Sequence, residues 1–276
     1  MNASKYHLCS FESRRQNEMA RLIERAGGVP TIAPSMREIP LSDNSAVFEF
    51  ADRLCAGQFP IVIFMTGVGT EAMFSVLETR NLVEPVLSAL QSVQVVARGP
   101  KPFAALSKMK VRVDIRAPEP NTWQDMVTEM VRHQVAFAGK KVAVQEYGAP
   151  SIDLYQWLKE HQAEAFPVPV YRWALPEDLA PLQHAIEATI AGKFDILLWT
   201  SAQQINHVLE VAQTMGVQSQ WLAAANRCVI GSIGPTASER LRSLGLPPDL
   251  EPSHPKMAHL VNETIQQAPE ILSQKR

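Results

Sequence analysis

The sequence contains little cysteine, and its cysteines form no motif. Only three of the 276 residues are cysteine, and Cys9, Cys55 and Cys228 lie far apart without a C-x-x-C pair. An odd and sparse count indicates reduced thiols in a cytosol-like compartment. Because Cys9 and Cys228 fall in strand-like apolar runs, we expect them to be buried as small apolar side chains.

Long apolar runs and an excess of one charge are also missing. No stretch approaches the roughly 18 uninterrupted apolar residues of a membrane span, and residues 1–15 hold no apolar segment of signal-peptide length. The formal net charge is −2, and lysine and arginine form no basic tract. Nothing therefore favours binding to nucleic acid or to a membrane, and we expect a soluble cytoplasmic protein.

Metal and nucleophile motifs are absent from the sequence as well. Its seven histidines show no H-x-x-x-H spacing and do not pair with cysteine, so we expect no metal site. Residues 231–234, GSIG, lack the glycine spacing of a nucleophile elbow. No Ser–His–Asp set or carboxylate pair stands out, although a triad is recognised only in three dimensions. An enzyme of this kind would position its substrate more than attack it.

The chain does contain a regular alternation of short apolar runs and helical patterns. Runs such as IVIFMT, VQVVA, KVAVQ and DILLWT are typical of strands, and most are followed by a polar turn and apolar residues at helical spacing. This rhythm predicts an α/β fold with parallel sheets. The length of 276 residues exceeds the usual size of one domain, so two domains are expected.

An internal repeat supports the division into two domains. Matching residues recur 134 or 135 positions apart along the chain. Gly99 matches Gly234 and Asp114 matches Asp249, each 135 positions on, and Thr66 lies near the place of Thr200, 134 positions on. The sequence therefore predicts two copies of one α/β unit, each near half of the chain.

Two proline-marked stretches, VPTIAPSMREIP and FPVPVYRWALPED, fall at equivalent places in the two copies. Proline favours extended backbone for itself and for the residue before it, so both stretches are expected to be connectors. If the chain crosses between lobes at each, one lobe is residues 37–172 and the other combines residues 1–36 with 173–276. The alternative is a single cut near residue 138.

Small polar turns follow several predicted strands in both lobes. They are TGVGTE (66–71), RGPKP (98–102), YGAPS (147–151), TSAQQ (200–204) and IGPTAS (233–238). In a parallel α/β sheet, ligands bind at the carboxyl ends of strands, where the next helix offers N–H groups and the positive end of its dipole. A cleft between lobes lined by such donors could hold a polyanion. The cations near these turns in sequence are Arg14, Arg15, Arg98 and Lys101.

Helix capping alone is the competing interpretation of these turns. Thr236-x-x-Glu239 and Ser201-x-x-Gln204 match the capping box, which contributes about 1 kcal/mol without any ligand. Capping accounts for a single turn. It accounts less well for five, because a cap requires neither glycine nor proline.

Two further features allow two interpretations each. The glycines of GVGTEA (67–72) resemble the G-x-G-x-x-A dinucleotide motif. The next predicted strand ends in Arg98 rather than in an acid, so a generic tight turn is favoured. Tyr171, beside the second connector, either faces the cleft or packs the hinge with Trp173, and the residues alone favour packing.

Three long segments together resemble a known family. They are SFESRRQNEMARLIERAGGVPTIAPSMRE, VYRWALPED with DILLWTSAQQINHVLEVA, and SIGPTASERLRSLGLPPDLEPSHPKMAHLV. In their order and spacing they resemble uroporphyrinogen-III synthases over essentially the whole chain. The resemblance implies two similar parallel-sheet, flavodoxin-like α/β lobes joined by a two-stranded connector. The chain would cross twice, which favours the discontinuous lobes.

The resemblance also implies a reaction. In this family linear hydroxymethylbilane loses its terminal hydroxyl, ring D is inverted through a spiro intermediate, and the macrocycle closes as uroporphyrinogen III without a cofactor. The acetate and propionate groups of that substrate fit the anion-holding turns. The implied partner is this small linear tetrapyrrole, and we expect a monomer to bind it. Transient contact with the preceding pathway enzyme is left open.

Individual residues match the family pattern. Tyr171 matches a tyrosine that is expected to assist departure of the hydroxyl as a hydrogen-bond donor. Thr236 matches the threonine of a G-P-T turn, and Ser201 matches the serine after the preceding strand. MTGVGT replaces the more usual T-S-x-x-A/G-V turn, and Pro102, beside Lys101, replaces a hydroxyl residue found in many members. The expected substrate-binding set is Arg14, Thr66, Gly67, Arg98, Gly99, Lys101, Thr200, Ser201, Gly234 and Thr236.

Three functions are compatible with the sequence. The first is an active synthase. The second is a non-catalytic module of the same fold that binds a tetrapyrrole or another polyanion, because the departures from the pattern fall in one lobe. The third is an unrelated two-lobed solute-binding protein, which the missing signal peptide disfavours. Conversion of hydroxymethylbilane to the III isomer would separate the first from the other two.

Overall fold

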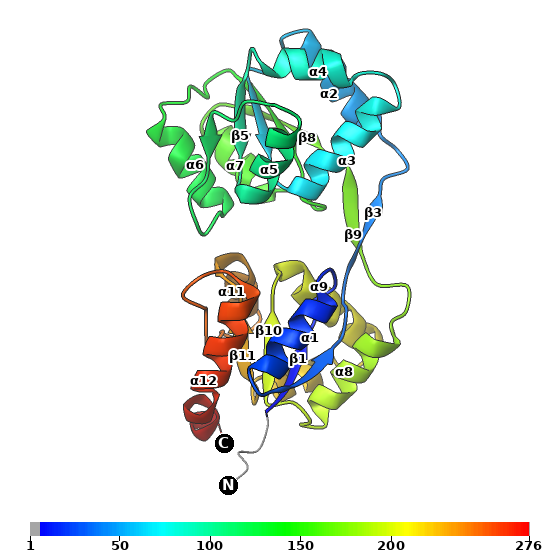
Figure 1. Ribbon diagram of the computed structural model, residues 1–276, viewed down its shortest axis with the longest axis vertical. Helices are drawn as coiled ribbons and strands as arrows, with labels where there is room; N and C mark the ends of the chain where they lie inside the picture. The colour runs from blue at the N-terminus through cyan, green and yellow to red at the C-terminus, as the bar shows by residue number, and fades with distance from the viewer. Residues whose placement is uncertain (1–5, 276) are drawn as a thin grey trace. The chain divides into compact units, whose positions relative to one another are not determined.

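The computed structural model describes residues 6–275, which divide into two compact units. Unit 1 contains the chain up to Arg37 and again from Ala174, and unit 2 is Glu38–Trp173. The boundaries expected from the sequence, 1–36 with 173–276 and 37–172, lie one residue away. Figure 1 shows the helices and strands of each unit.

Unit 1 is built on a parallel sheet whose described strands have the order β11-β10-β1-β2. The strands are β1 (His7–Ser10), β2 (Val29–Ile32), β10 (Ile196–Trp199) and β11 (Val229–Ser232). A parallel bridge between Gly231 and Leu250 continues the sheet beyond β11. The helices are α1 (Gln16–Arg25), α8 (Ala180–Ile190), α9 (Ala202–Thr214), α10 (Gln218–Ala225), α11 (Pro235–Ser243) and α12 (Met257–Lys275).

Unit 2 has a parallel sheet in which the described strands follow the order β6-β5-β4-β7-β8. The strands are β4 (Ile61–Phe64), β5 (Gln94–Ala97), β6 (Ile115–Arg116), β7 (Lys141–Gln145) and β8 (Glu164–Val168). The helices are α2 (Ser45–Cys55), α3 (Gly67–Glu78), α4 (Val83–Leu90), α5 (Pro100–Lys108), α6 (Trp123–Arg132) and α7 (Ile152–Glu160).

The two sheets have the same topology. Ile61 of β4 pairs with Gln94 and Val142, and Ile196 of β10 pairs with Val229 and Leu8, so the two isoleucines are equivalent. From this register Thr66 corresponds to Ser201, at an offset of 135. Thr200, which the sequence placed near the equivalent of Thr66, lies one residue before Ser201.

The repeated aspartates make the same contact in both units. Asp114 Oδ2 accepts the backbone N–H of Val95 in β5 at 2.8 Å. Asp249 Oδ2 accepts the backbone N–H of Ile230 in β11 at 2.7 Å. Each carboxylate thus fastens the segment that follows a helix to the neighbouring strand, which gives a structural reason for the repeat.

The chain passes from one unit to the other twice, in β3 (Arg37–Pro40) and in β9 (Tyr171–Ala174). These strands form a separate two-stranded sheet. The predicted architecture, two similar parallel α/β lobes with a two-stranded connector, is thereby confirmed. The prolines of both stretches explain why these residues are extended.

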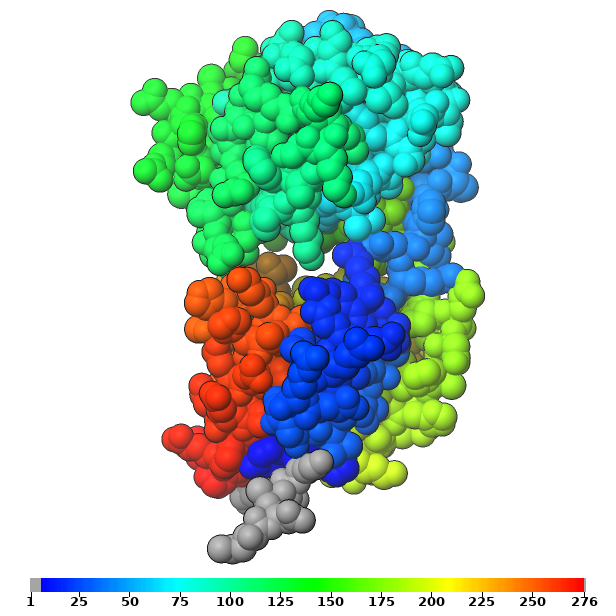
Figure 2. Space-filling view, in the orientation of Figure 1, coloured from blue at the N-terminus to red at the C-terminus, as the bar shows by residue number. Residues whose placement is uncertain are grey.

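Helices cover both faces of each sheet. In unit 1 the buried residues of α8, α9, α10 and α11 pack on one face, and those of α1 and α12 on the other. Figure 2 shows α1 (blue) and α12 (red) next to each other on the surface of this unit. In unit 2, α2, α3, α4 and α5 share one core and α6 and α7 the other. Coverage on both faces explains why IVIF and ILLW are fully buried, continuously apolar strands.

Two of the three cysteines are buried in unit 1, as expected. Cys9 and Cys228 are at most 3% exposed. Burial raises the pKa of both thiols, that of Cys228 to about 11. These cysteines are thus uncharged, small core residues, whereas Cys55 is an exposed thiol.

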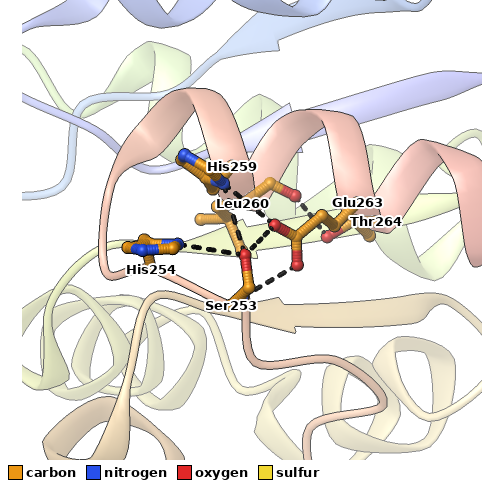
Figure 3. Close-up of polar contacts among 6 residues, drawn as sticks. All are labelled: Ser253, His254, His259, Leu260, Glu263 and Thr264. Atoms are coloured by element: carbon orange, nitrogen blue, oxygen red, sulfur yellow. Dashed lines mark hydrogen bonds and ion pairs between the residues drawn. The ribbon is translucent and has the colours of Figure 1, made fainter.

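A carboxylate fastens the loop before α12 to the helix itself (Figure 3). Ser253 donates its hydroxyl to Glu263 Oε1 at 2.6 Å and its backbone N–H to Oε2 at 2.8 Å. His259 Nδ1 lies 3.0 Å from the same Oε1. The hydrogen bonds from Ser253 lower the pKa of the Glu263 carboxyl. Both oxygens of this carboxylate are therefore used to hold the chain entering the last helix.

Candidate functional site

The turn after β4 is a helix cap built around Thr66. Its Oγ1 accepts the backbone N–H of Gly69 at 3.0 Å, which closes the first turn of α3. A Cβ at Gly69 would lie 1.9 Å from Nε2 of Gln145, and one at Gly67 would lie 2.8 Å from the carbonyl oxygen of Lys101. The two glycines are thus required by close packing of α3 against β7 and α5. This packing agrees with the generic tight turn favoured from the sequence.

Gln145 completes this turn, and the sequence interpretation did not include it. It is 1% exposed and ends β7, the strand beside β4. Its Oε1 accepts the backbone N–H of Thr66 at 3.2 Å. The sequence feature that could have pointed to Gln145 is its place as a polar residue at the end of the buried strand KVAVQ.

Tyr171 of β9 lies against the same turn. Its hydroxyl oxygen is 3.4 Å from Thr66 Oγ1. Its ring meets that of Trp173 edge-on, with centroids 5.3 Å apart and planes at 90°. The residue is 4% exposed. Packing with Trp173, the alternative favoured from the sequence, is therefore observed, and the hydroxyl also reaches the cap of α3.

Arg98 places a guanidinium close to the phenol rings of Tyr147 and Tyr171. It follows β5 and is half-buried, and its guanidinium carbon lies 5.5 Å from the centroid of the Tyr147 ring. Burial lowers the pKa of Arg98, and the interactions with the Tyr147 and Tyr171 phenols oppose that shift. For residues 6–275 no hydrogen bond or ion pair of this side chain is recorded. The guanidinium can therefore accept a carboxylate as partner.

The second predicted turn of unit 2 begins α5 at Gly99. Gly99 is the N-cap in extended conformation, and a Cβ there would lie 3.0 Å from Oδ1 of Asn121. Lys101 is exposed in the first turn of this helix, and Pro102 is buried. The lysine side chain and the positive end of α5 therefore lie at the same end of the sheet as Arg98.

The equivalent turn of unit 1 follows β10. Ser201 Oγ accepts the N–H of Gln203 at 3.2 Å, so Ser201 caps α9. The predicted capping box with Gln204 is wrong. Gln204 bonds to Thr200 instead, accepting its backbone N–H at 2.9 Å and donating to its Oγ1 at 2.7 Å.

The turn after β11 begins α11 with Gly234 as N-cap and Pro235 in the first turn. The predicted capping box from Thr236 to Glu239 is therefore wrong, because the cap is a glycine without a side chain. Thr236 is exposed, and no hydrogen bond of its hydroxyl is recorded within the described chain. Ser232 and Ser238, whose Oγ atoms are 2.8 Å apart, fasten this turn internally.

Two buried glutamates at equivalent positions were missed in the sequence. The ladder register places Glu12 after β1 where Glu146 stands after β7. Glu12 is 8% exposed, and its carboxylate accepts the N–H groups of Arg14 and Arg15, at 2.9 and 3.1 Å, and the hydroxyl of Thr200. The backbone N–H groups before α1 are therefore already bound to a carboxylate of the protein itself, that of Glu12.

Glu146 has fewer partners than its equivalent. It is 5% exposed, and its Oε1 accepts the hydroxyl of Tyr155. Burial raises the pKa of the Glu146 carboxyl, and the bond from Tyr155 opposes that shift. Both glutamates close the carboxyl end of a central strand, next to the turns described above.

The predicted site residues thus form two groups, each at the carboxyl ends of the strands of one unit. Unit 2 brings together Thr66, Gly67, Arg98, Gly99, Lys101 and Tyr171. Unit 1 carries Arg14, Thr200, Ser201, Gly234 and Thr236. Within residues 6–275, no three His, Cys, Asp or Glu side chains gather so as to hold a metal ion. No helix in the described part of the chain combines the length and apolar character needed to cross a membrane.

A family model accounts for most of this chain. Residues 17–262 match the model described as uroporphyrinogen-III synthase HemD. The chain belongs to this family. Uroporphyrinogen-III synthases are lyases of tetrapyrrole and haem biosynthesis, and their family implies a small-molecule tetrapyrrole substrate. The resemblance read from the sequence is therefore confirmed.

Relatives of known sequence or structure cover nearly the whole chain. "Uncharacterized protein YjjA" of Bacillus subtilis (strain 168) is 25% identical over 255 residues, which cover 91% of this chain and 92% of that protein. A mutant uroporphyrinogen III synthase from the extremely thermophilic bacterium Thermus thermophilus has a TM-score of 0.72 at 20% identity, covering 96% of this chain and 99% of that one. The enzyme from Helicobacter pylori 26695 has a TM-score of 0.51 at 17% identity, covering 95% and 99%. At these identities the structural matches establish the fold.

Proposed function

We propose that this protein is an active uroporphyrinogen-III synthase. It converts linear hydroxymethylbilane to uroporphyrinogen III and water, with inversion of ring D through a spiro intermediate. Membership of the family supports the reaction class. The observation that carries the proposal is the contact of Tyr171 with Thr66 beside the Arg98 cation. The reaction is assigned to a cytoplasmic monomer and needs no cofactor, nucleic acid or membrane.

Tyr171 is the proposed donor to the departing hydroxyl. Thr66 Oγ1 accepts the Gly69 N–H, and in this proposal it donates its own proton to the Tyr171 oxygen 3.4 Å away. The phenol can then donate its proton to the substrate oxygen. When the C–O bond breaks, the hydroxyl leaves as water with the proton of Tyr171, and the proton that the substrate loses on ring closure returns to the phenolate.

The carboxylates of the substrate are proposed to bind at the strand-end turns. In unit 2, Arg98 supplies a guanidinium and α5 presents the N–H groups of its first turn near Gly99. In unit 1, α9 and α11 present theirs near Ser201 and Thr236. Each well-made hydrogen bond to a charged group contributes roughly 1.5–3 kcal/mol. Several such bonds hold a polyacid without the basic patch that the sequence lacks.

Orientation is the main contribution expected from the protein. The free bilane closes readily without rearrangement, so the enzyme must hold the two ends of the substrate in the rarer geometry that inverts ring D. Fixing reacting groups in this way lowers the barrier through pre-organisation. The proposal therefore requires fixed hydrogen-bond donors more than strong acids or bases.

The test is to supply hydroxymethylbilane and separate the I and III isomers of the product. The wild-type protein is expected to give the III isomer. Tyr171→Phe is expected to lower turnover on the order of 10²-fold, because it removes the proton donor but keeps the ring. Tyr6→Phe, in unit 1, serves as the matched control and should not change the rate.

Different outcomes identify the alternatives. Unchanged formation of the III isomer by Tyr171→Phe would reject the role of the tyrosine. Only the spontaneous I isomer from the wild type would reject the synthase. In that case, saturable binding of uroporphyrinogen would favour the non-catalytic tetrapyrrole-binding module.

A further inference from the structure

We propose that Trp173, together with the Tyr147–Gly148 turn, is the positioning element that holds the ring of Tyr171 in its working orientation. The inference rests on the proposed function, because it assigns a role within the same site. Tyr171 and Trp173 lie two residues apart in β9 and so project from the same face of the strand. Their edge-on contact at 5.3 Å is a favourable aromatic geometry.

Trp173 is itself fixed by two hydrogen bonds to one turn. Its indole Nε1–H donates to the carbonyl oxygen of Tyr147 at 2.7 Å. Its backbone N–H donates to the carbonyl oxygen of Gly148 at 3.3 Å. The indole has a single N–H, so the first bond sets the orientation of the ring. The Trp173 ring is thereby held to the loop that follows β7.

Gly148 allows the turn to approach both rings. Its φ of +87° lies in the left-handed region that glycine adopts readily. A Cβ at this position would lie 2.6 Å from Cε2 of Tyr171 and 2.7 Å from Nε1 of Trp173. The Tyr171 and Trp173 rings therefore occupy the space that a side chain at position 148 would need, and they pack directly against the glycine backbone. The Tyr171 ring is confined by the indole and by this backbone.

Confinement of the ring fixes the position of the hydroxyl. The phenolic oxygen is placed 3.4 Å from Thr66 Oγ1, within the field of the Arg98 guanidinium. A misplacement of about 1 Å can lower a rate roughly 10²-fold. Loss of the indole N–H should therefore affect the chemical step, although Trp173 itself need not touch the substrate.

Trp173→Phe tests this role, because it keeps an aromatic edge and removes the N–H donor. We expect kcat for the III isomer to fall roughly ten- to a hundredfold, KM to stay within about twofold, and the share of the I isomer to rise. Trp157→Phe is the matched control. Trp157 of α7 stacks on His161, the C-cap residue of that helix, at a centroid distance of 3.7 Å, and its replacement should leave both kinetic constants unchanged.

A second measurement does not depend on activity. The chain has only four tyrosines, so ring-labelled tyrosine gives few NMR signals, and Tyr171→Phe identifies that of Tyr171. We expect slow ring flips of Tyr171 in the wild type and in Trp157→Phe, and faster flips in Trp173→Phe. Benzothienylalanine placed at position 173 replaces the N–H by sulfur with little change in shape. It should give the same result if Trp173→Phe folds poorly.

Two results would overturn the inference. One is a folded variant that lacks the indole N–H at position 173 but keeps the kcat and the isomer ratio of the wild type. The other is an unchanged flip rate of the Tyr171 ring, even if activity falls. A wild-type protein that yields only the I isomer would reject the proposed function, and the flip rates would still decide whether Trp173 positions Tyr171.

Discussion

Arg98 is a half-buried cation that faces phenol rings rather than a carboxylate. Its guanidinium carbon lies 5.5 Å from the Tyr147 ring, and burial lowers the pKa of Arg98. A cation removed from water without a paired anion opposes folding. Retaining it at the end of β5 is readily explained if a ligand carboxylate supplies the missing partner. In the proposed function, this residue connects the energetics of the fold to the charge of the substrate.

Arg98→Met should weaken substrate binding while the protein stays folded. The variant loses a charge-assisted contact of roughly 1.5–3 kcal/mol, so KM for hydroxymethylbilane is expected to rise about ten- to a hundredfold. The midpoint of thermal unfolding should not fall, because no ion pair is lost. Arg132→Met, at an exposed position of α6, is the control. A normal KM for Arg98→Met would remove this residue from the substrate site.

Glu12 and Glu146 show which residues of the candidate site a sequence does not reveal. Glu12 binds Thr200, 188 positions away, and Glu146 binds Tyr155 across a turn. Neither stands in a motif, and charged residues in polar turns are ordinarily exposed. Arg98, Thr66 and Ser201 were named from the sequence because they follow strands, whose carboxyl ends meet at one edge. Tyr171 was named because it lies beside the second connector and matches a tyrosine of the family. The partners of Glu12 and Glu146 could be identified only from the folded structure.

At the scale of elements, the start of α3 differs from the start of α9 in where the glutamine side chain beside the helix cap comes from. Gly69 corresponds to Gln204 of the other unit, and the space that a side chain at Gly69 would need is filled by Gln145 of β7. In unit 2 the amide near the cap thus comes from the neighbouring strand, and in unit 1 from the helix itself. The unusual MTGVGT turn therefore has a packing explanation.

Gly69→Ala should destabilise unit 2 by about 1–3 kcal/mol. The new Cβ would lie 1.9 Å from Gln145 Nε2 and 2.8 Å from Thr66 Oγ1, so the buried amide must move and the cap is disturbed. Urea unfolding measures the change. Adding Gln145→Ala to Gly69→Ala should recover part of the loss, because the two sites are coupled. Strictly additive effects of the two substitutions would contradict this explanation.

The loop entering α12 gives a dependence of stability on pH. Hydrogen bonds from Ser253 lower the pKa of Glu263 in the folded protein, with a smaller contribution from His259. A lowered pKa means that the stabilisation is present above the unfolded value, about 4.3. It is lost as the pH falls through the folded value.

Glu263→Gln should therefore lower the free energy of unfolding at pH 6, and its deficit relative to the wild type should shrink as the pH falls below about 4. Urea unfolding at a series of pH values measures this difference. Glu270→Gln on the same helix is the control, because no ion pair of its carboxylate is recorded in residues 6–275. A deficit that does not change with pH would contradict the assignment.

At the scale of the whole molecule, the internal repeat allowed most of the fold to be predicted. The Asp114 and Asp249 pair marks the same strand contact in both units, and the Gly99 and Gly234 pair marks the same helix start. Such residues can be recognised because their contacts are local to one strand and its neighbour. The capping box at Ser201 was predicted incorrectly because its hydroxyl bonds to the second residue of α9 rather than the third. The one at Thr236 was predicted incorrectly because the N-cap of α11 is Gly234, two residues earlier.

The connectivity of the units predicts how the chain can be divided. Unit 2 is continuous from Glu38 to Trp173 and has buried cores on both faces of its sheet. A fragment of residues 38–173 should therefore fold alone, with one cooperative transition and an unfolding free energy of about 5–15 kcal/mol. Circular dichroism during thermal unfolding and dispersion of the NMR spectrum measure this.

The matching fragment of unit 1, residues 174–276, should behave differently. It lacks β1, which lies between β10 and β2 and contributes Leu8 and Cys9 to the two cores. We expect this fragment to remain largely unfolded until a peptide of residues 1–37 is added, because the interior strand of a parallel sheet cannot be replaced by solvent. Cooperative folding of residues 174–276 without the peptide would show that β1 is dispensable, and failure of residues 38–173 to fold would show that unit 2 depends on the rest of the chain.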